Sequence, residues 1–128
     1  MPPLQVVPHP AEAARLLSRS TPAAQADRVA SAGELAARYK SAVVLKGAGS
    51  ICAMPDGTWF VNTTGNPGMA SAGMGDVLTG FVAALLAQGA GATTALLAAV
   101  HLHGAAGDAL SAAHGQIGMT AGECIAAA

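Results

Sequence analysis

The stretch NTTGNPGMASAGMGDVLTG, residues 62–80, decides how the rest of the chain is interpreted. Its first part is rich in glycine, and from Asp76 onward the apolar residues recur at the spacing of a buried helix. Glycine permits positive φ and leaves backbone N–H groups uncovered, and the first amides of a helix have no acceptor within it. We therefore predict a loop over residues 63–75 that leads into a helix and binds an anion at the junction.

Asp76 stands in the first turn of this predicted helix, next to Gly73, Met74 and Gly75, whose N–H groups could hold a phosphoryl group. One interpretation is a helix cap, because aspartate is favoured at the positive end of a helix. The other is a catalytic base, which takes a proton from an attacking hydroxyl while the amides hold the transferring phosphoryl group. A lone Gly-x-Gly-Asp favours the cap, and the flanking pattern favours the catalytic base.

Charge is distributed unevenly along the chain. All six Lys and Arg residues lie within the first 46 positions, and the formal net charge is −1. A near-neutral chain argues against a nucleic-acid groove or an anionic membrane surface as partner. Any phosphate bound by the later part must be held by backbone amides, helix N-termini or a metal rather than by arginine.

Cys52 and Cys124 are far apart and form no CxxC motif, which favours a reduced, cytoplasmic setting. No His, Cys and carboxylate cluster has the spacing of a metal site, so we predict no protein metal centre. Residues 77–107 carry no formal charge, but a glycine-rich interruption at 88–94 favours two buried helices joined by a turn over a membrane span. On these apolar helix positions, His101 and His103 are interpreted as packed core histidines.

The remaining pattern predicts an α/β fold. The expected elements are helices from Pro10 to about Arg19 and from Pro22 to about Tyr39, a buried strand 42–46, a hairpin of 51–54 with 58–62, helices 76–88 and 93–113, and a terminal helix capped by Thr120 and Glu123. Hydrophobic residues make up 52% of the chain and aromatics only 3%, so the packing is expected to be close and built from small side chains. Only one convincing buried strand precedes the hairpin, and we expect the domain to lack its N-terminal βα units.

Four ordered blocks resemble the NAD(P)H-hydrate dehydratase family, a branch of the ribokinase-like fold. They are Pro8-His9-Pro10-x-Glu12, residues 44–50 (VLKGAGS), the loop and helix start at 65–80, and Leu102-His103-Gly104-x-Ala106-Gly107-Asp108. The resemblance covers essentially the whole chain. It implies that residues 1–128 are the single C-terminal portion of a three-layer α/β/α domain about twice as long.

The resemblance also implies a metabolite-repair reaction. The family restores NADH or NADPH from its hydrate by phosphorylating the ring hydroxyl from ADP or ATP, with Mg²⁺ arriving with the nucleotide, and phosphate then leaves. Asp76 would be the base and would contact the hydrate, together with His9. The implied nucleotide-binding residues are Lys46, Gly47, Ala48, Gly49, Ser50, Gly65, Asn66, Pro67, Gly68, Met69, Gly73, Met74 and Gly75.

Alternatives remain open at several of these positions. Lys46 with the glycine after it also fits a solvated turn, and His9 also fits an exposed loop histidine. Ala11 and Ala72 stand where the family has glycine, and an added methyl at Ala72 would restrict the loop. Alternative functions are a small-molecule kinase of the same superfamily, or a fragment that needs a complementary chain and by itself has weak or no activity. A homo-oligomer is possible.

Overall fold

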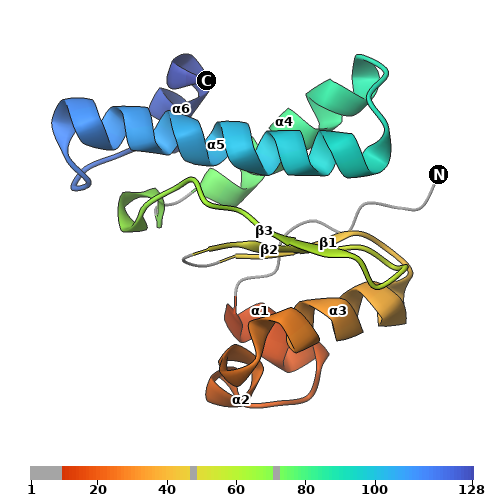
Figure 1. Ribbon diagram of the computed structural model, residues 1–128. Helices are drawn as coiled ribbons and strands as arrows, with labels where there is room; N and C mark the ends of the chain where they lie inside the picture. Colours follow the sequence, from red (N-terminus) through yellow and green to blue (C-terminus); the bar gives the residue numbers. More distant parts are fainter. Residues whose placement is uncertain (1–9, 47–48, 71–72) are drawn as a thin grey trace. The chain divides into compact units, whose positions relative to one another are not determined.

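The computed structural model describes residues 10–46, 49–70 and 73–128 (Figure 1). The chain divides into two compact units, one that ends at Asn62 and one that begins at Thr63. Each unit is considered by itself.

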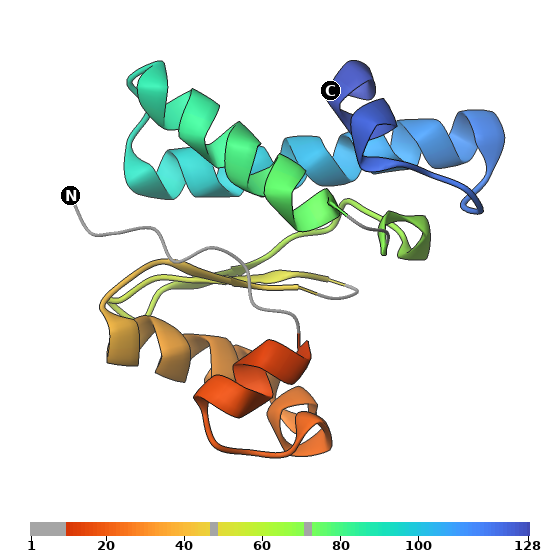
Figure 2. The same ribbon diagram turned by 180° about the vertical axis from the view of Figure 1, so that it is seen from behind.

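The first unit packs helices on a small antiparallel sheet. Its elements are α1 (Pro10–Leu16), α2 (Thr21–Ala26), α3 (Arg28–Tyr39), β1 (Val43–Leu45), β2 (Ile51–Ala53) and β3 (Trp59–Val61). The strand order is β1-β2-β3, with Val43 opposite Ala53 and Ile51 opposite Val61. The helices lie on one face of this sheet in both views (Figures 1 and 2). The predicted buried strand and hairpin are therefore confirmed, each slightly shorter than expected.

The core of this unit follows from the two-residue period of the strands. Alternate strand residues, among them Val43, Leu45 and Ile51, form one buried cluster with Leu35 and other residues of α1 and α3. Many members are alanines, which lets helix and sheet approach closely. The alanines predicted to allow close packing therefore lie in the core between the helices and the sheet.

The single helix predicted from Pro22 to Tyr39 is wrong, because Asp27 separates α2 from α3. Asp27 has a non-helical backbone (φ −139°, ψ 87°), and its carboxylate accepts the Ala30 N–H at 3.0 Å. Aspartate competes for backbone amides in this way, and the bond starts a new helix. The first helix also ends earlier than predicted, at Leu16, and Ser18 follows with φ 55°.

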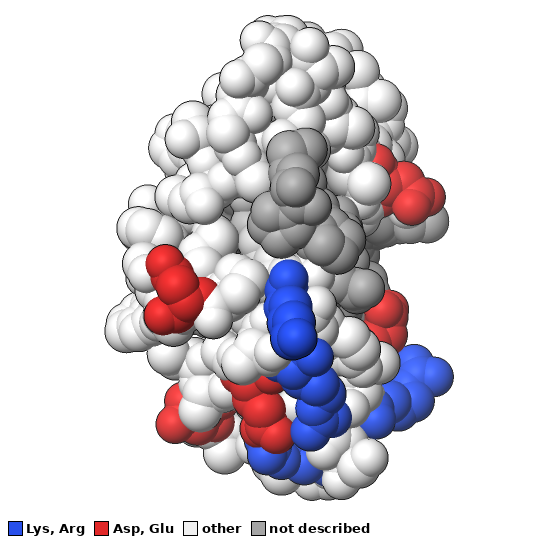
Figure 3. Space-filling view, turned by 90° about the vertical axis from the view of Figure 1, so that its right-hand side faces the viewer, with Lys and Arg blue, Asp and Glu red and all other residues white. Residues whose placement is uncertain are grey.

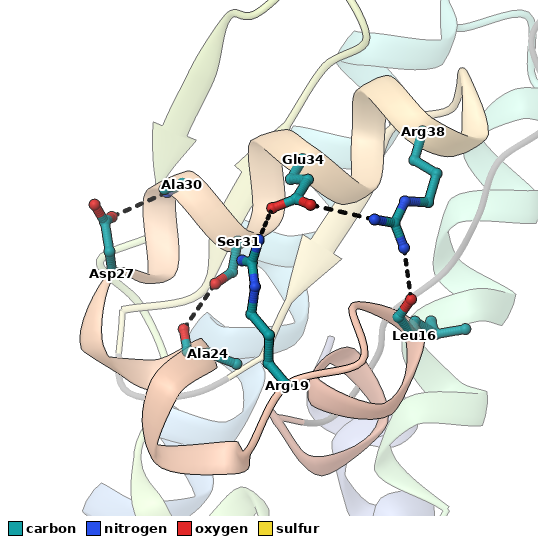
Figure 4. Close-up of polar contacts among 8 residues, drawn as sticks. All are labelled: Leu16, Arg19, Ala24, Asp27, Ala30, Ser31, Glu34 and Arg38. Carbon is teal, nitrogen blue, oxygen red and sulfur yellow. Dashed lines mark hydrogen bonds and ion pairs between the residues drawn. The ribbon is translucent and has the colours of Figure 1, made fainter.

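Charged side chains join the helices of the first unit. Glu34 pairs with Arg19 at 2.6 Å and with Arg38 at 3.2 Å, and Arg38 also donates to the Leu16 carbonyl oxygen at 2.8 Å (Figure 4). In Figure 3 the Lys and Arg side chains gather together with acidic side chains beside them. Exposed pairs of this kind contribute only about 0–1 kcal/mol each, so the apolar cluster remains the main stabilising element.

The second unit is helical. It contains the short 3-10 helix η1 (Pro67–Met69), α4 (Met74–Ala87), α5 (Ala92–His114) and α6 (Ala121–Ala127). Helices α4 and α5 pack against each other after a short turn (Figures 1 and 2). This confirms two helices for the uncharged run, and none of the helices among the described residues is long and apolar enough to cross a membrane. The predicted capping box of Thr120 and Glu123 is also present at the start of α6.

Candidate functional site

Helix α4 begins at Met74, two residues earlier than the predicted start at Asp76. Gly73 is its N-cap with φ 83°, a conformation that residues with a Cβ rarely adopt. The first hydrogen bond of the helix runs from the Val77 N–H to the Gly73 carbonyl oxygen at 3.1 Å. The N–H groups of Met74, Gly75 and Asp76 therefore have no acceptor within the helix, which is the arrangement that favours an anion.

Asp76 occupies the third helical position, and its side chain is exposed. Its carboxylate makes no hydrogen bond or ion pair with any residue that the structure describes, and the N-cap position has no side-chain capping bond. A capping aspartate would use its oxygens on the first amides of the helix. Gly73 rather than Asp76 is thus the N-cap of α4, and the interpretation of Asp76 as a side-chain cap is wrong.

An apolar cluster fixes the start of α4. Met74 is buried with Met119 and with Cys124 of α6, and the partly buried Met69 packs against the same cluster. Met69 and Met74 lie on either side of residues 70–73. The residues directly before and after 70–73 are therefore anchored in the same cluster.

The segment from Gly65 to Met69 has its own internal hydrogen bonds. Asn66 is the N-cap of η1, and its side-chain oxygen accepts the Gly68 N–H at 3.0 Å. Gly65 takes φ 105°, so a residue with a Cβ would be strained there. The Met69 N–H donates to the Asn66 carbonyl oxygen at 3.1 Å.

Helix α5 holds this segment through residues whose role the sequence did not reveal. Asp108 accepts the Gly65 N–H at 3.0 Å and the Asn66 side-chain NH₂ at 2.9 Å. The Thr64 hydroxyl donates to the His101 carbonyl oxygen at 2.9 Å, and Gly104 lies so close to Thr64 that a Cβ there would overlap it. The block Leu102–Asp108 was the only sequence signal for this contact.

The two histidines of α5 differ in their surroundings. His103 is buried and meets the Phe81 ring edge-on, with ring centroids 5.8 Å apart, so the prediction of a packed histidine is confirmed. His101 is exposed, so the same prediction is wrong for it. Because both histidines have apolar neighbours in sequence, the pattern did not indicate which of the two side chains is exposed.

In the first unit, the predicted nucleotide-binding turn follows β1. Lys46, Gly49 and Ser50 are half-buried, and Gly49 takes φ 67°. The Arg28 guanidinium donates to the Leu45 and Gly49 carbonyl oxygens, both at 3.2 Å. The structure thus shows an arginine that holds both ends of this turn, which no sequence motif indicated.

Several predicted positions lie outside the described residues: His9, Gly47, Ala48 and Ala72. Ala11 lies in α1, but its side chain is not described. Among the described ranges no group of three His, Cys, Asp or Glu side chains could hold a metal ion.

The sequence of this chain is similar to those of proteins of known family. A family model described as NAD(P)H-hydrate dehydratase matches residues 3–127. The ADP-dependent (S)-NAD(P)H-hydrate dehydratase of Neisseria meningitidis is 46% identical over 126 residues, which are 98% of this chain and 43% of that protein.

Two solved structures give the same result for the fold. An ADP/ATP-dependent NAD(P)H-hydrate dehydratase from Bacillus subtilis, co-crystallised with ATP/Mg²⁺ and soaked with CoA, matches with a TM-score of 0.91 and 34% identity over 95% of this chain and 46% of that one. A ribokinase-like superfamily protein from Enterococcus faecalis matches with a TM-score of 0.76, also at 34% identity, over 95% of this chain and 42% of that one. The chain spans less than half of the length of each of these proteins.

The fold and the helix-start site therefore define a ribokinase-like α/β protein, which confirms the predicted fold class. The chain belongs to the NAD(P)H-hydrate dehydratase family. The resemblance found in the four sequence blocks is thereby confirmed.

Proposed function

We propose that the protein carrying this chain converts hydrated NADH or NADPH back to the reduced cofactor, with ADP or ATP as phosphoryl donor. The observation that carries the proposal is the start of α4, where three N–H groups without helical partners adjoin an exposed carboxylate. The names of the relatives support the same reaction class, because one is ADP-dependent and another was crystallised with ATP/Mg²⁺.

The roles proposed for the start of α4 follow from its chemistry. Among these N–H groups, those of Met74 and Gly75 would hold the phosphoryl group as negative charge develops on it, together with the N–H of Gly73 just before the helix. Asp76 would accept the proton of the ring hydroxyl as its oxygen attacks the terminal phosphorus of the nucleotide. AMP would leave from ADP, or ADP from ATP, as the new P–O bond forms. The phosphorylated hydrate would then lose phosphate from one ring carbon and a proton from the adjacent carbon, which restores the double bond.

Nucleotide binding by Lys46–Ser50 and hydrate binding by His9 stay proposals. For Gly65–Met69, which was also predicted to bind nucleotide, the contribution would be indirect, because most of its N–H groups already have acceptors. The turn after β1 suits phosphate because it combines an ammonium group with a glycine backbone. Mg²⁺ would be held mainly by the nucleotide phosphates, as is usual for nucleotide-bound magnesium. The second unit, which has no Lys or Arg, fits a phosphate held by amides and a metal.

The test compares Asp76→Asn with the wild type and with Asp56→Asn in the protein at its natural length. Asp56 is a matched control, since it is an exposed aspartate in the hairpin turn whose carboxylate accepts the Thr58 N–H. Each protein is incubated with NADH hydrate and ADP or ATP, and regenerated NADH is followed by its absorbance. We expect Asp76→Asn to lower kcat by about 100-fold or more, because general-base catalysis typically contributes 10²–10⁴-fold, and Asp56→Asn to leave it unchanged.

Two results would overturn the proposal. A wild-type protein that phosphorylates a small molecule but never regenerates NADH would be a kinase of the same superfamily. An Asp76→Asn protein with wild-type kcat would show that the carboxylate is not the base. Thermal shift with ADP checks that the variant still binds nucleotide, because ligand binding to the folded state raises the melting temperature.

A further inference from the structure

One face of α5 makes a row of contacts with the segment that precedes α4. His101, Gly104 and Asp108 are spaced by three and four residues, so they lie along the same side of the helix. The carbonyl of His101 accepts the Thr64 hydroxyl, Gly104 leaves room for Thr64, and Asp108 receives Gly65 and Asn66. Farther along, a Cβ on Gly107 would overlap the Met69 side chain.

The Asp108 carboxylate is suited to this contact because it is an acceptor on both oxygens. One oxygen takes the Gly65 N–H and the other takes the Asn66 NH₂. The Asn66 amide is thereby oriented with its own oxygen toward the Gly68 N–H. An uncharged asparagine at 108 offers one acceptor and one donor, so it cannot satisfy both partners without turning Asn66 away from Gly68.

The hydrogen bonds of residues 65–70 leave few N–H groups for a phosphate. The N–H of Gly65 goes to Asp108, and that of Gly68 goes to the Asn66 side chain. Those of Met69 and Ala70 go to carbonyl oxygens at Asn66 and Pro67, and proline has no N–H. A backbone N–H usually makes one good hydrogen bond, so this segment is built more as a support than as an anion-binding loop.

We propose that Asp108 is a positioning residue, which clamps the segment Gly65–Met69 to α5 and thereby sets the start of α4. The link from clamp to helix is the apolar cluster in which Met69 packs beside the buried Met74. Residues 74–76 then present their amides and the Asp76 carboxylate in a fixed geometry. The inference rests on the proposed function, in that Asp76 and these amides act on the nucleotide and the hydrate.

Three variants test the clamp in the protein at its natural length. Asp108→Asn removes the double acceptor, and Asn66→Asp places a carboxylate against the carboxylate of Asp108. The double variant N66D/D108N exchanges the two groups. In it, the asparagine introduced at 108 can accept the Gly65 N–H and donate to the carboxylate introduced at 66, whose other oxygen can accept the Gly68 N–H. Asp56→Asn again serves as the charge-matched control.

The first readout is amide hydrogen exchange, which does not depend on turnover. We expect both single variants to increase exchange at Gly65 and Gly68 and also at Val77, whose N–H makes the first hydrogen bond of α4. The double variant should restore protection at both places. Protection that stays at the wild-type level in both single variants would overturn the proposal. Faster exchange at Gly65 and Gly68 with no change at Val77 would also overturn it, because the segment would then not set the start of α4.

The second readout separates positioning from a purely structural role. We expect Asp108→Asn to lower kcat by about 10–100-fold while the nucleotide KM stays within about threefold, because small misplacement of reacting groups acts mainly on the transition state. A lower melting temperature with wild-type kcat below that temperature would reject the positioning role. A parallel rise in nucleotide KM would show that the segment itself binds the phosphates. A wild-type protein without NADH regeneration would instead contradict the proposed function, and the exchange readout would still decide whether the clamp exists.

Discussion

The turn at Leu45–Ser50 and the segment Gly65–Met69 are held in opposite ways. Arg28 donates to two carbonyl oxygens of the first, whereas Asp108 accepts from an N–H and a side-chain NH₂ of the second. The hydrogen bonds from Arg28 use none of the N–H groups of its turn. The bonds to Asp108 occupy the N–H of Gly65 and orient the side chain that occupies the N–H of Gly68.

This difference indicates different tasks for two glycine-containing segments that look alike in sequence. A cation on carbonyl oxygens uses acceptors and no N–H donor, so the bonds from Arg28 are compatible with the nucleotide contact proposed for the turn after β1. An anion on amides removes donors, so the segment before α4 suits a support. The use of an acidic clamp in the second unit also agrees with the charge distribution, because this unit has no Lys or Arg side chain that could donate to carbonyl oxygens.

The largest stability effect is expected at Arg28. Arg28→Met removes both hydrogen bonds from a charged donor, each of which contributes about 1.5–3 kcal/mol, so we expect a loss of roughly 3 kcal/mol in the free energy of unfolding. Arg28→Lys should recover only part of this, because one ammonium does not match two carbonyl oxygens as a guanidinium fork does. Urea denaturation measures the change. An Arg28→Met protein with the wild-type free energy of unfolding would show that Arg28 does not hold its turn as Asp108 is proposed to hold Gly65–Met69.

A smaller effect is expected where α5 approaches Thr64. Gly104→Ala places a Cβ 2.7 Å from the Thr64 carbonyl carbon, so the backbone must shift, and overpacking of this kind costs about 1–3 kcal/mol. Gly80→Ala is the matched control, since nothing lies within 4 Å of a Cβ there and the site is inside a helix. It should stabilise the protein by up to about 1 kcal/mol. Changes of the same sign in thermal melts would contradict the close contact.

A third effect, confined to alkaline pH, concerns a buried thiol in the first unit. Burial raises the pKa of the Cys52 thiol from its ordinary 9.0 to about 11, which favours the protonated form in the folded protein. The unfolded chain therefore loses this proton first, and stability falls as the pH rises from 9 toward 11, by about 1.4 kcal/mol per pH unit. Cys52→Ala should have a flatter profile over this window in urea titrations at several pH values. Equal slopes for the two proteins would contradict the assignment.

Cys124 in the second unit provides an internal comparison for this measurement. Burial raises the pKa of its thiol as well, and the adjacent Glu123 charge acts in the same direction. Cys124→Ala should therefore also flatten the alkaline slope. The two variants together tell which unit contributes the loss of stability.

The sequence predicted caps and turns correctly where residues close together in the chain form them. Thr120 and Glu123 form a capping box within four residues, and Pro55-Asp56-Gly57 forces the turn between β2 and β3. Asp27 shows the limit of this approach, since a polar residue within a helical pattern either continues the helix or caps a new one. The competing hydrogen bond to Ala30 decided the outcome.

By itself, the sequence determined the family, the hairpin, helices α4, α5 and α6, and the carboxylate beside the amides at the start of α4, because each depends on residue type and short spacing. Tertiary structure alone decided that Asp108 reaches Gly65 and Asn66, more than forty positions earlier in the chain, and that Arg28 reaches Leu45 and Gly49. Such pairs form only when separate elements pack. The sequence around a charged residue in a helix does not indicate which distant backbone group it will contact.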